Sequence, residues 1–292
     1  MEPGLNRRNF VAALAASSLV PRFALASGRL RIASLDWALT ETMLAIGLAP
    51  VAVVAAADWH RFVVDPALPS AVADLGLQQE INLELLASLE PDLILTSPFV
   101  PDIERVLHRI APTLRLSIFE QTSLPLEHSR ALTRVIGQRL DRAAEAERFL
   151  ADAERLFDAY RARVAALKPS PVLLVNFIDA RHVRVYGGSG IFQNVLDRIG
   201  LSNVWTGKTN YWGFATVGVE ELATDKDLRL MAFEPIPADA RPTLERSPLW
   251  SRLPFVEANH VSVLPPVFMF GAMPSALRCA RLLVQHLEDT PA

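Results

Sequence analysis

The sequence has little cysteine, no block of basic residues and no long apolar run. Its one cysteine in 292 residues, Cys279, excludes a disulfide framework. The 29 lysines and arginines are balanced by 32 aspartates and glutamates, so nucleic acid is not an expected partner. No stretch reaches the ~18 uninterrupted apolar residues that a membrane-spanning helix requires. A hydrophobic content of 51% nevertheless predicts a globular chain with a substantial core.

The first 26 residues have the pattern of an export signal. Arg7 and Arg8 precede an apolar run over residues 10–20, and residues 24–26 offer the small side chains that a signal peptidase accepts. Paired arginines ahead of a mildly hydrophobic, alanine-rich run resemble a twin-arginine signal, which carries folded proteins into the bacterial periplasm. No cysteine that could carry a lipid anchor lies at the predicted cleavage site, since Cys279 is near the other end of the chain. We therefore expect a cleaved signal peptide and a mature protein that is free in the periplasm.

Short apolar stretches alternate with helical patterns through the rest of the chain. Residues 93–96, 116–119, 172–177 and 261–264 are predicted to form strands, which indicates an α/β protein. Residues 139–167 are rich in Ala, Arg, Glu and Leu and contain neither glycine nor proline, which predicts one long helix. At ~1.5 Å per residue this helix would be on the order of 45 Å long and could join two lobes as a rigid strut.

The chain is expected to divide into two similar lobes around this helix. We assign residues 27–138 to the N-terminal lobe, 139–168 to the connecting helix and 169–292 to the C-terminal lobe, with the ligand cleft between the lobes. A weak internal repeat agrees with this division, because residues 82–87 resemble residues 218–223. In each copy a short helix that carries a glutamate leads into a buried strand. Chance similarity between two helix–strand units is the alternative explanation.

Several short motifs give the chain a family resemblance. They are Leu75-Gly76-Leu77, Asn82 to Leu86, Arg109 to Pro112, Phe192-Gln193, Val195 to Asp197, Thr209 to Gly213, Pro248 to Trp250 and Gly271-Ala272. In order and spacing they are similar to the periplasmic ferric-hydroxamate siderophore-binding proteins of bacterial ABC importers, whose two α/β lobes are joined by one long helix. The resemblance extends from Arg31 to Leu287. It implies a monomeric binding protein, not an enzyme, that delivers a ferric siderophore to an inner-membrane permease and its ATPase.

The same resemblance implies that the protein has no cofactor of its own. In that family the siderophore fills the coordination shell of Fe(III), so the protein supplies no metal ligands. The residues agree, because none of the 6 histidines shows a His-x-x-x-His spacing or lies near the cysteine in a zinc-site pattern. We therefore expect iron to be bound only through its chelator.

The family resemblance also implies a ligand cleft that is lined mostly by aromatic side chains. Carried over position by position, its residues are Trp59, Phe62, Gln78, Phe99, Val100, Trp205, Asn210, Trp212, Phe268 and Phe270. Aromatic rings suit a rounded, mostly neutral chelate, because they offer a large apolar area and lose little rotamer entropy. Asn210 could donate a hydrogen bond to a chelate oxygen. Each aromatic residue alone could equally pack in the core, but Trp212 lies in a polar loop that ends in glycine.

Two positions depart from the hydroxamate-binding pattern. That family characteristically has an arginine and a tyrosine that touch the chelating oxygens, where this chain has Gln78 and Val100, with Phe99 next to Val100. A neutral amide is a weaker donor than a guanidinium. The expected ligand is therefore a hydroxamate, a mixed citrate–hydroxamate or another siderophore. His60 and Arg61 could meet a ligand carboxylate, although a solvated surface role is the favoured interpretation of both.

Two glutamates occupy equivalent places in the internal repeat. Proteins of this family dock onto the permease through one exposed carboxylate on each lobe, and Glu84 and Glu220 match those positions. The alternative for either residue is an acidic side chain that is favourable near a helix start because of the helix dipole.

Other functions fit the sequence less well. A haem- or cobalamin-binding protein of the same fold is the main alternative, because a fold does not determine its ligand. The glycine-rich turn at residues 187–190 lacks the spacing of a nucleotide-binding loop. Asp179, His182 and Ser189 match no hydrolytic motif, so a periplasmic enzyme is a minor alternative.

Overall fold

The computed structural model describes residues 30–119, 124–223 and 227–290, and the chain from Arg31 onward forms one compact unit. The predicted signal peptide lies outside these residues. Within them, no helix combines the length and the hydropathy that crossing a membrane requires.

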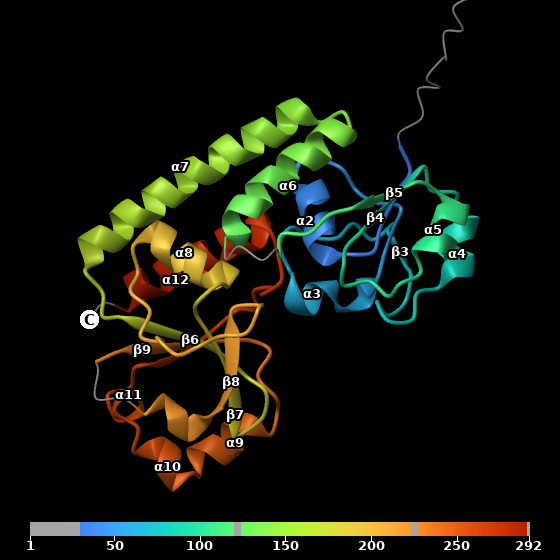
Figure 1. Ribbon diagram of the computed structural model, residues 1–292. Helices are drawn as coiled ribbons and strands as arrows, with labels where there is room; N and C mark the ends of the chain where they lie inside the picture. Colours follow the sequence, from blue (N-terminus) through green and yellow to red (C-terminus); the bar gives the residue numbers. More distant parts are fainter. Residues whose placement is uncertain (1–29, 120–123, 224–226, 291–292) are drawn as a thin grey trace, which may run out of the picture. The chain divides into compact units, whose positions relative to one another are not determined.

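The N-terminal lobe is built on a parallel sheet of five strands among the described residues, in the order β3-β2-β1-β4-β5 (Figure 1). The strands are β1 (Ile32–Ser34), β2 (Ala52–Val53), β3 (Ala73–Asp74), β4 (Leu93–Thr96) and β5 (Thr113–Arg115). The connecting helices are α2 (Trp37–Ala45), η1 (Ala56–Asp58), α3 (Trp59–Phe62), α4 (Leu83–Ser88) and α5 (Glu104–Ile110). Parallel strands require such crossover connections, which explains the alternation in the sequence.

The C-terminal lobe contains a mixed sheet in the order β10-β9-β6-β7-β8. Its strands are β6 (Val172–Phe177), β7 (His182–Tyr186), β8 (Phe214–Gly218), β9 (Arg229–Phe233) and β10 (Val261–Leu264). Its helices are α8 (Ile191–Ile199), η2 (Val219–Leu222), α9 (Ala240–Glu245), α10 (Pro248–Ser251), α11 (Pro254–Glu257) and α12 (Met273–Asp289). Strand β7 is antiparallel to β6 and β8, whereas β6, β9 and β10 are parallel. The two sheets confirm the predicted α/β class.

The internal repeat has a counterpart in the topology. Strand β4 lies between β1 and β5, and strand β9 lies between β6 and β10. The short helix α4 precedes β4, and η2 precedes β9. The two copies of the repeat therefore occupy equivalent places in their sheets.

Two helices, α6 (Pro125–Arg139) and α7 (Ala143–Leu167), lie between the lobes in the sequence (Figure 1). Helix α7 begins four residues later than predicted, because Asp141 adopts a left-handed backbone conformation that ends α6. The helices pack closely at Gly137, where an added Cβ would lie 2.6 Å from that of Ala146. The 25 residues of α7 correspond to a length of about 37 Å.

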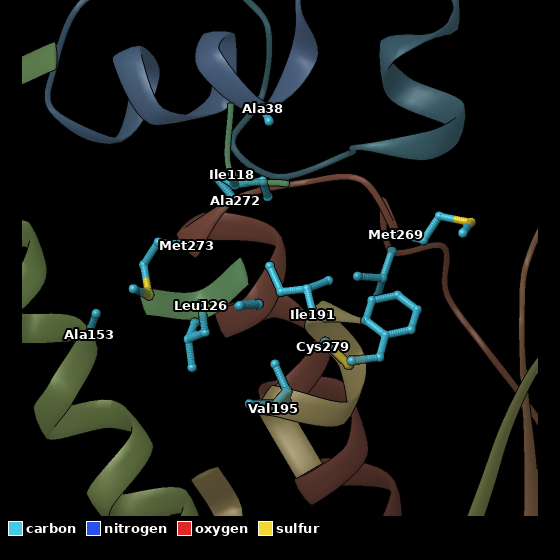
Figure 2. Packing of buried hydrophobic residues seen from close by; sticks show 14 of the residues in the cluster. Ala38, Ile118, Leu126, Ala153, Ile191, Val195, Met269, Ala272, Met273 and Cys279 are labelled. Atoms are coloured by element: carbon cyan, nitrogen blue, oxygen red, sulfur yellow. The ribbon is translucent and has the colours of Figure 1, made fainter. Parts of the chain in front are cut away.

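The largest hydrophobic cluster in the described residues joins the two lobes. It includes Ala38 of α2 and Leu126 of α6, together with buried residues of α7, α8 and α12. Figure 2 shows Ile191 and Val195 of α8 next to Cys279 of α12. Burial raises the pKa of the Cys279 thiol, which behaves as a small hydrophobic side chain. Helix α12 also contacts α2, so it connects the core of the C-terminal lobe to the N-terminal lobe.

The loop that carries Trp212 depends on a close backbone approach. Gly213 has φ +81°, and a Cβ at this position would overlap the backbone N and Cα of Gly190, the residue that precedes α8. We therefore expect Gly213→Ala to destabilise the protein by about 1 to 3 kcal/mol more than a substitution that only strains φ. Gly47→Ala is the matched control, because Gly47 has φ +80° and nothing within 4 Å of an added Cβ. If urea unfolding showed the same loss in the free energy of unfolding for Gly213→Ala and Gly47→Ala, the close approach of Gly213 to Gly190 would be contradicted.

Candidate functional site

Two cavities with shared walls lie between the lobes. Their volumes are about 420 Å³ and about 650 Å³, within the range of roughly 300 to 1,000 Å³ typical of ligand pockets. The first cavity is lined by residues 36–39, 54–55, 77–79, 99, 116–119 and 132 of the N-terminal part, and by Trp212, Phe268 and Phe270. The second is lined by Trp37, Arg61 and Phe62, and by residues 176–177, 184, 234–238 and 267–270 of the C-terminal lobe. Trp37, Phe268 and Phe270 line both cavities, so their rings lie between the two.

Trp37 is held at this position by the start of helix α2. The preceding residue, Asp36, caps α2 by accepting hydrogen bonds from the backbone N–H groups of Ala38 (2.8 Å) and Leu39 (3.2 Å). The indole Nε1 of Trp37 donates to the carbonyl oxygen of Val54 at 2.7 Å. Because both its backbone and its indole are fixed, the ring has a defined orientation at the cavity wall.

The first cavity contains no cation among its described lining residues. Its acidic group is Asp36, and burial raises the pKa of this carboxyl, although hydrogen bonds from Ser97 and from the start of α2 oppose that shift. Gln78 is half-buried, and its Nε2 donates only a long hydrogen bond of 3.4 Å to the carbonyl oxygen of Leu35. The polar lining of this cavity therefore consists mainly of neutral groups.

Aromatic rings from both lobes meet at the first cavity. The ring of Trp212 lies with its centroid 4.5 Å from that of Phe99, 5.0 Å from Phe119 and 5.2 Å from Phe270. The tilted and edge-on geometries are those that aromatic pairs prefer. Trp212 thus connects the C-terminal lobe to the N-terminal loop at Phe99, whose side chain remains 37% exposed.

Asn210 organises the loop rather than lining a cavity. Its Oδ1 accepts hydrogen bonds from the backbone N–H groups of Trp212 (2.9 Å) and Phe214 (3.2 Å). This Asx-type turn explains why asparagine precedes the tryptophan at this spacing. The carboxamide oxygen is therefore already engaged in positioning Trp212.

The second cavity has a polar floor formed by β6 and β7. The hydroxyl of Tyr186 donates to Oδ1 of Asn176 at 2.5 Å and lies 3.1 Å from the Sδ of Met269. The Nδ2 of Asn176 donates to the carbonyl oxygen of Phe233 at 2.7 Å. Burial raises the pKa of Tyr186, so its hydroxyl stays neutral and keeps its proton for this network. Arg184, on the same strand, also lines this cavity.

The structure brings together six of the ten predicted cleft residues. Phe62, Gln78, Phe99, Trp212, Phe268 and Phe270 each line at least one of the two cavities. Trp59, Val100, Trp205 and Asn210 line neither.

Burial and local hydrogen bonds account for these corrections to the predicted lining. Trp59 is only 2% exposed, and its Nε1 donates to the carbonyl oxygen of Pro66, so it supports the ring of Trp37 from behind. Val100 is 7% exposed and belongs to the hydrophobic core of the N-terminal lobe. Trp205 packs against the core of the C-terminal lobe.

Trp37 and Arg184 are among the lining residues that sequence reasoning missed. Trp37 lies three residues beyond the end of β1, and the carboxyl ends of parallel strands are the usual place for ligand contacts. Its position after β1 could therefore have identified Trp37 as a candidate ligand contact. Arg184 alternates with the buried residues Val183 and Val185, but this alternation does not show that the charged face of the strand lines a cavity.

The predicted docking residues lie apart from both cavities. Glu84 is exposed in the first turn of α4, and Glu220 is exposed in the first turn of η2.

In the part of the chain that the structure describes, no group of three or more His, Cys, Asp or Glu residues is arranged to hold a metal ion.

Comparisons with known proteins agree with this architecture. The family model described as "Periplasmic binding protein" matches residues 32–268. The chain is 33% identical to the iron(3+)-hydroxamate-binding protein FhuD of Escherichia coli (strain K12) over 285 residues, 96% of each chain. It is 26% identical to the achromobactin-binding periplasmic protein of Dickeya dadantii (strain 3937), over 80% of this chain and 78% of that protein.

A solved structure extends the likeness to the fold. The siderophore-binding protein FhuD from Vibrio cholerae, with Fe3+–Desferal bound, matches with a TM-score of 0.84 at 27% identity and covers 91% of this chain and 100% of its own. The family model and the full-length relative agree with the resemblance carried by the motifs. This chain therefore belongs to the periplasmic binding protein family.

Proposed function

We propose that this protein captures a ferric siderophore in the cleft between its lobes and delivers it to an ABC importer for iron uptake. The observation that carries the proposal is the pair of cavities lined by aromatic rings from both lobes. Their volumes suit a compact chelate, and the identity to the E. coli protein extends over nearly the whole chain. The iron is cargo bound through its chelator, and the protein's own role is binding rather than catalysis.

Export and delivery complete the proposal. Residues 1–26 act as a cleavable signal of the twin-arginine type, so the mature protein operates in the periplasm. A monomer with its ligand then meets a permease and its ATPase in the inner membrane. Glu84 and Glu220, one exposed carboxylate on each lobe, provide the contacts to the permease.

The lining of the first cavity favours a chelate that is neutral where it contacts the protein. Gln78 and Gln79 offer neutral hydrogen-bonding groups, and Phe99 offers an apolar ring. A trihydroxamate siderophore fits this lining, because three hydroxamates fill the coordination shell of Fe(III) and cancel its charge. A mixed citrate–hydroxamate siderophore, whose ferric complex is negatively charged, fits when its hydroxamates face this cavity. Haem and cobalamin are the alternatives that a binding experiment has to compare.

Intrinsic fluorescence provides the test, because Trp37 and Trp212 line the cavities. We expect saturable quenching by ferric desferrioxamine B and weaker or no quenching by haem and cobalamin. Trp212→Ala should weaken binding of the ferric chelate by about 1 to 3 kcal/mol, because it removes one aromatic wall of the first cavity. Trp250→Phe is the control, since Trp250 packs in the core of the C-terminal lobe outside both cavities.

Two results would count against the proposal in different ways. Saturable binding of haem or cobalamin without binding of any ferric siderophore would assign the cleft another ligand. Normal affinity in Trp212→Ala would show that the ligand binds elsewhere on the molecule.

A further inference from the structure

Strand β7 places an arginine on the face of the sheet that forms the floor of the second cavity. Arg184 lies directly across from Asn176 of β6 and Thr216 of β8 in the strand register. Val183 and Val185 on either side are fully buried in the core on the opposite face. The strand's alternation therefore fixes the direction of the Arg184 side chain toward the cavity.

The guanidinium of Arg184 is held in place but is largely unpaired. It lies over the ring of Phe214, with its Cζ 5.2 Å from the ring centroid, and its Nη1 has only a weak contact of 3.9 Å with the Sδ of Met269. Its Nε is buried and has no hydrogen-bond partner among the residues that the structure describes. No carboxylate of the described residues forms an ion pair with it. A buried donor without a partner is unfavourable, which indicates that another group completes this site.

Among the described residues, the neighbouring polar groups Asn176, Tyr186 and Thr216 form no hydrogen bond with the guanidinium. Asn176 and Tyr186 are engaged with each other, and Asn176 also donates to the carbonyl oxygen of Phe233. The unmet donors of Arg184 are therefore available to a ligand.

A second arginine lines the same cavity from the other lobe. Arg61 of α3 is exposed, and its guanidinium lies over the ring of Phe62. The cavity's acidic residue is Glu234, which is exposed and forms no ion pair with either arginine within the described residues. Two cations and one carboxylate leave this cavity with an excess of positive charge, in contrast to the first cavity.

We propose that the second cavity binds a carboxylate of the ligand, with Arg184 as its main donor and Arg61 as a second donor from the opposite wall. The guanidinium fork matches the planar geometry of a carboxylate, and a partly buried site strengthens the interaction. This inference rests on the proposed function, and it narrows the ligand class to ferric siderophores that carry a carboxylate apart from the groups facing the first cavity. Trp37, Phe268 and Phe270 border both cavities, so one ligand can contact the two.

The alternative is that Arg184 only supports the fold through Phe214 and Met269. The two roles differ in their dependence on ligand charge. A supporting role would make Arg184→Met affect all ligands and the thermal stability alike. A binding role would make the effect specific to ligands that carry a carboxylate.

The experiment uses two derivatives of ferric desferrioxamine B with the same iron centre. Its free amine is capped with an acetyl group, which leaves a neutral tail, or with a succinyl group, which leaves a carboxylate. We expect the wild-type protein to bind the succinyl derivative roughly 10- to 100-fold more tightly than the acetyl derivative. Arg184→Met should abolish this preference by weakening binding of the succinyl derivative far more than binding of the acetyl derivative, whereas Arg61→Met should reduce the preference only partly.

The matched control is Arg241→Met, which removes the same charge from an exposed position on α9 outside both cavities. It should keep the full preference for the succinyl derivative. Arg184→Gln serves as a second variant if Arg184→Met does not fold, and it should also lose the preference.

The outcomes separate this inference from the function on which it rests. If the acetyl derivative binds but the succinyl derivative is not preferred, or if the preference survives in the Arg184 variants, the carboxylate site is overturned while siderophore binding stands. If neither derivative binds the wild-type protein, siderophore binding itself fails and the carboxylate site fails with it.

Discussion

Replacing Glu84 and Glu220 together by arginine is expected to abolish uptake of the ferric siderophore and to leave its binding intact. Both side chains are exposed, and neither lines a cavity. They lie at the start of α4 and η2, which precede equivalent strands of the two sheets. A permease built from two similar halves requires such a matched pair of contacts. Charges on an exposed rim determine recognition and association far more than they determine the stability of the fold.

The competing explanation predicts a much smaller effect. An acidic residue at a helix start contributes about 0.3 to 1 kcal/mol through the helix dipole. Losing that contribution at Glu84 and Glu220 would lower the stability slightly and would not alter delivery. Uptake therefore separates the two roles, since docking predicts its complete loss.

Uptake of labelled iron by cells that contain only the variant protein is the measurement, with ligand affinity and the thermal midpoint of the purified variant recorded alongside. The matched control is Asp102→Arg with Glu245→Arg, which reverses one exposed carboxylate on each lobe outside both cavities. This control should transport iron normally. Wild-type uptake by the Glu84 and Glu220 double variant would refute the docking assignment.

The sequence predicted best those elements that are bounded by strong local signals. Strand β6 runs from Val172 to Phe177 as expected, because an apolar run follows Pro171 directly. Strand β4 likewise covers residues 93–96 as expected, because Pro91 and Asp92 directly precede its apolar run. In these cases the local chemistry and the tertiary packing favour the same boundary.

Strands whose bounds depend on pairing with a neighbouring strand were predicted poorly from the sequence. The strand expected over residues 116–119 is wrong, since pairing with β4 places β5 at Thr113–Arg115 and leaves residues 116–119 at the wall of the first cavity. Strand β8 was not predicted, because it is a partly exposed edge strand whose pairing with β7 makes it a strand. Neither outcome follows from hydrophobic periodicity, which carries no information about pairing partners.

The sequence also does not predict which individual side chains line the two cavities. Trp59 and Phe62 lie on one short helix, and the structure buries the first and exposes part of the second to a cavity. Arg184 is one position in an alternating strand, and its importance comes from the unpaired Nε that only the three-dimensional surroundings reveal. The sequence could identify candidate aromatic residues, but the packing of the two lobes decides which of them line a cavity.

The second large effect expected concerns Glu41, a fully buried carboxyl where α2 of the N-terminal lobe meets the start of α12. Its Oε1 accepts hydrogen bonds from the backbone N–H groups of Ala272 and Ser275, and its Oε2 lies 2.6 Å from the hydroxyl of Ser275. These hydrogen bonds lower the pKa, but desolvation outweighs them, and a small repulsion from Asp36 acts in the same direction. The net result raises the pKa of Glu41 from 4.5 to about 8.

This shift has a definite sign for stability. Below pH 4.5 the carboxyl is protonated in the folded and the unfolded chain, so the contribution of Glu41 to the free energy of unfolding does not change with pH. Between pH 4.5 and about 8 only the unfolded chain loses the proton, so the free energy of unfolding falls as the pH rises. The full shift corresponds to a loss of up to about 5 kcal/mol.

Glu41→Gln should remove this pH dependence, because the amide keeps the shape and the hydrogen bonds of the protonated carboxyl and cannot ionise. We expect the variant to match the wild-type protein near pH 4.5 and to exceed its stability by several kcal/mol above pH 8. Urea unfolding of both proteins across this range is the measurement, and taking their difference cancels the contributions of titrating groups that do not interact with Glu41. Glu41→Ala is the control, because it leaves the donors at Ala272 and Ser275 without a partner. At low pH it should be less stable than the wild-type protein, whereas Glu41→Gln should match the wild-type protein there. A difference between Glu41→Gln and the wild-type protein that stays constant with pH would show that Glu41 is ionised in the folded state.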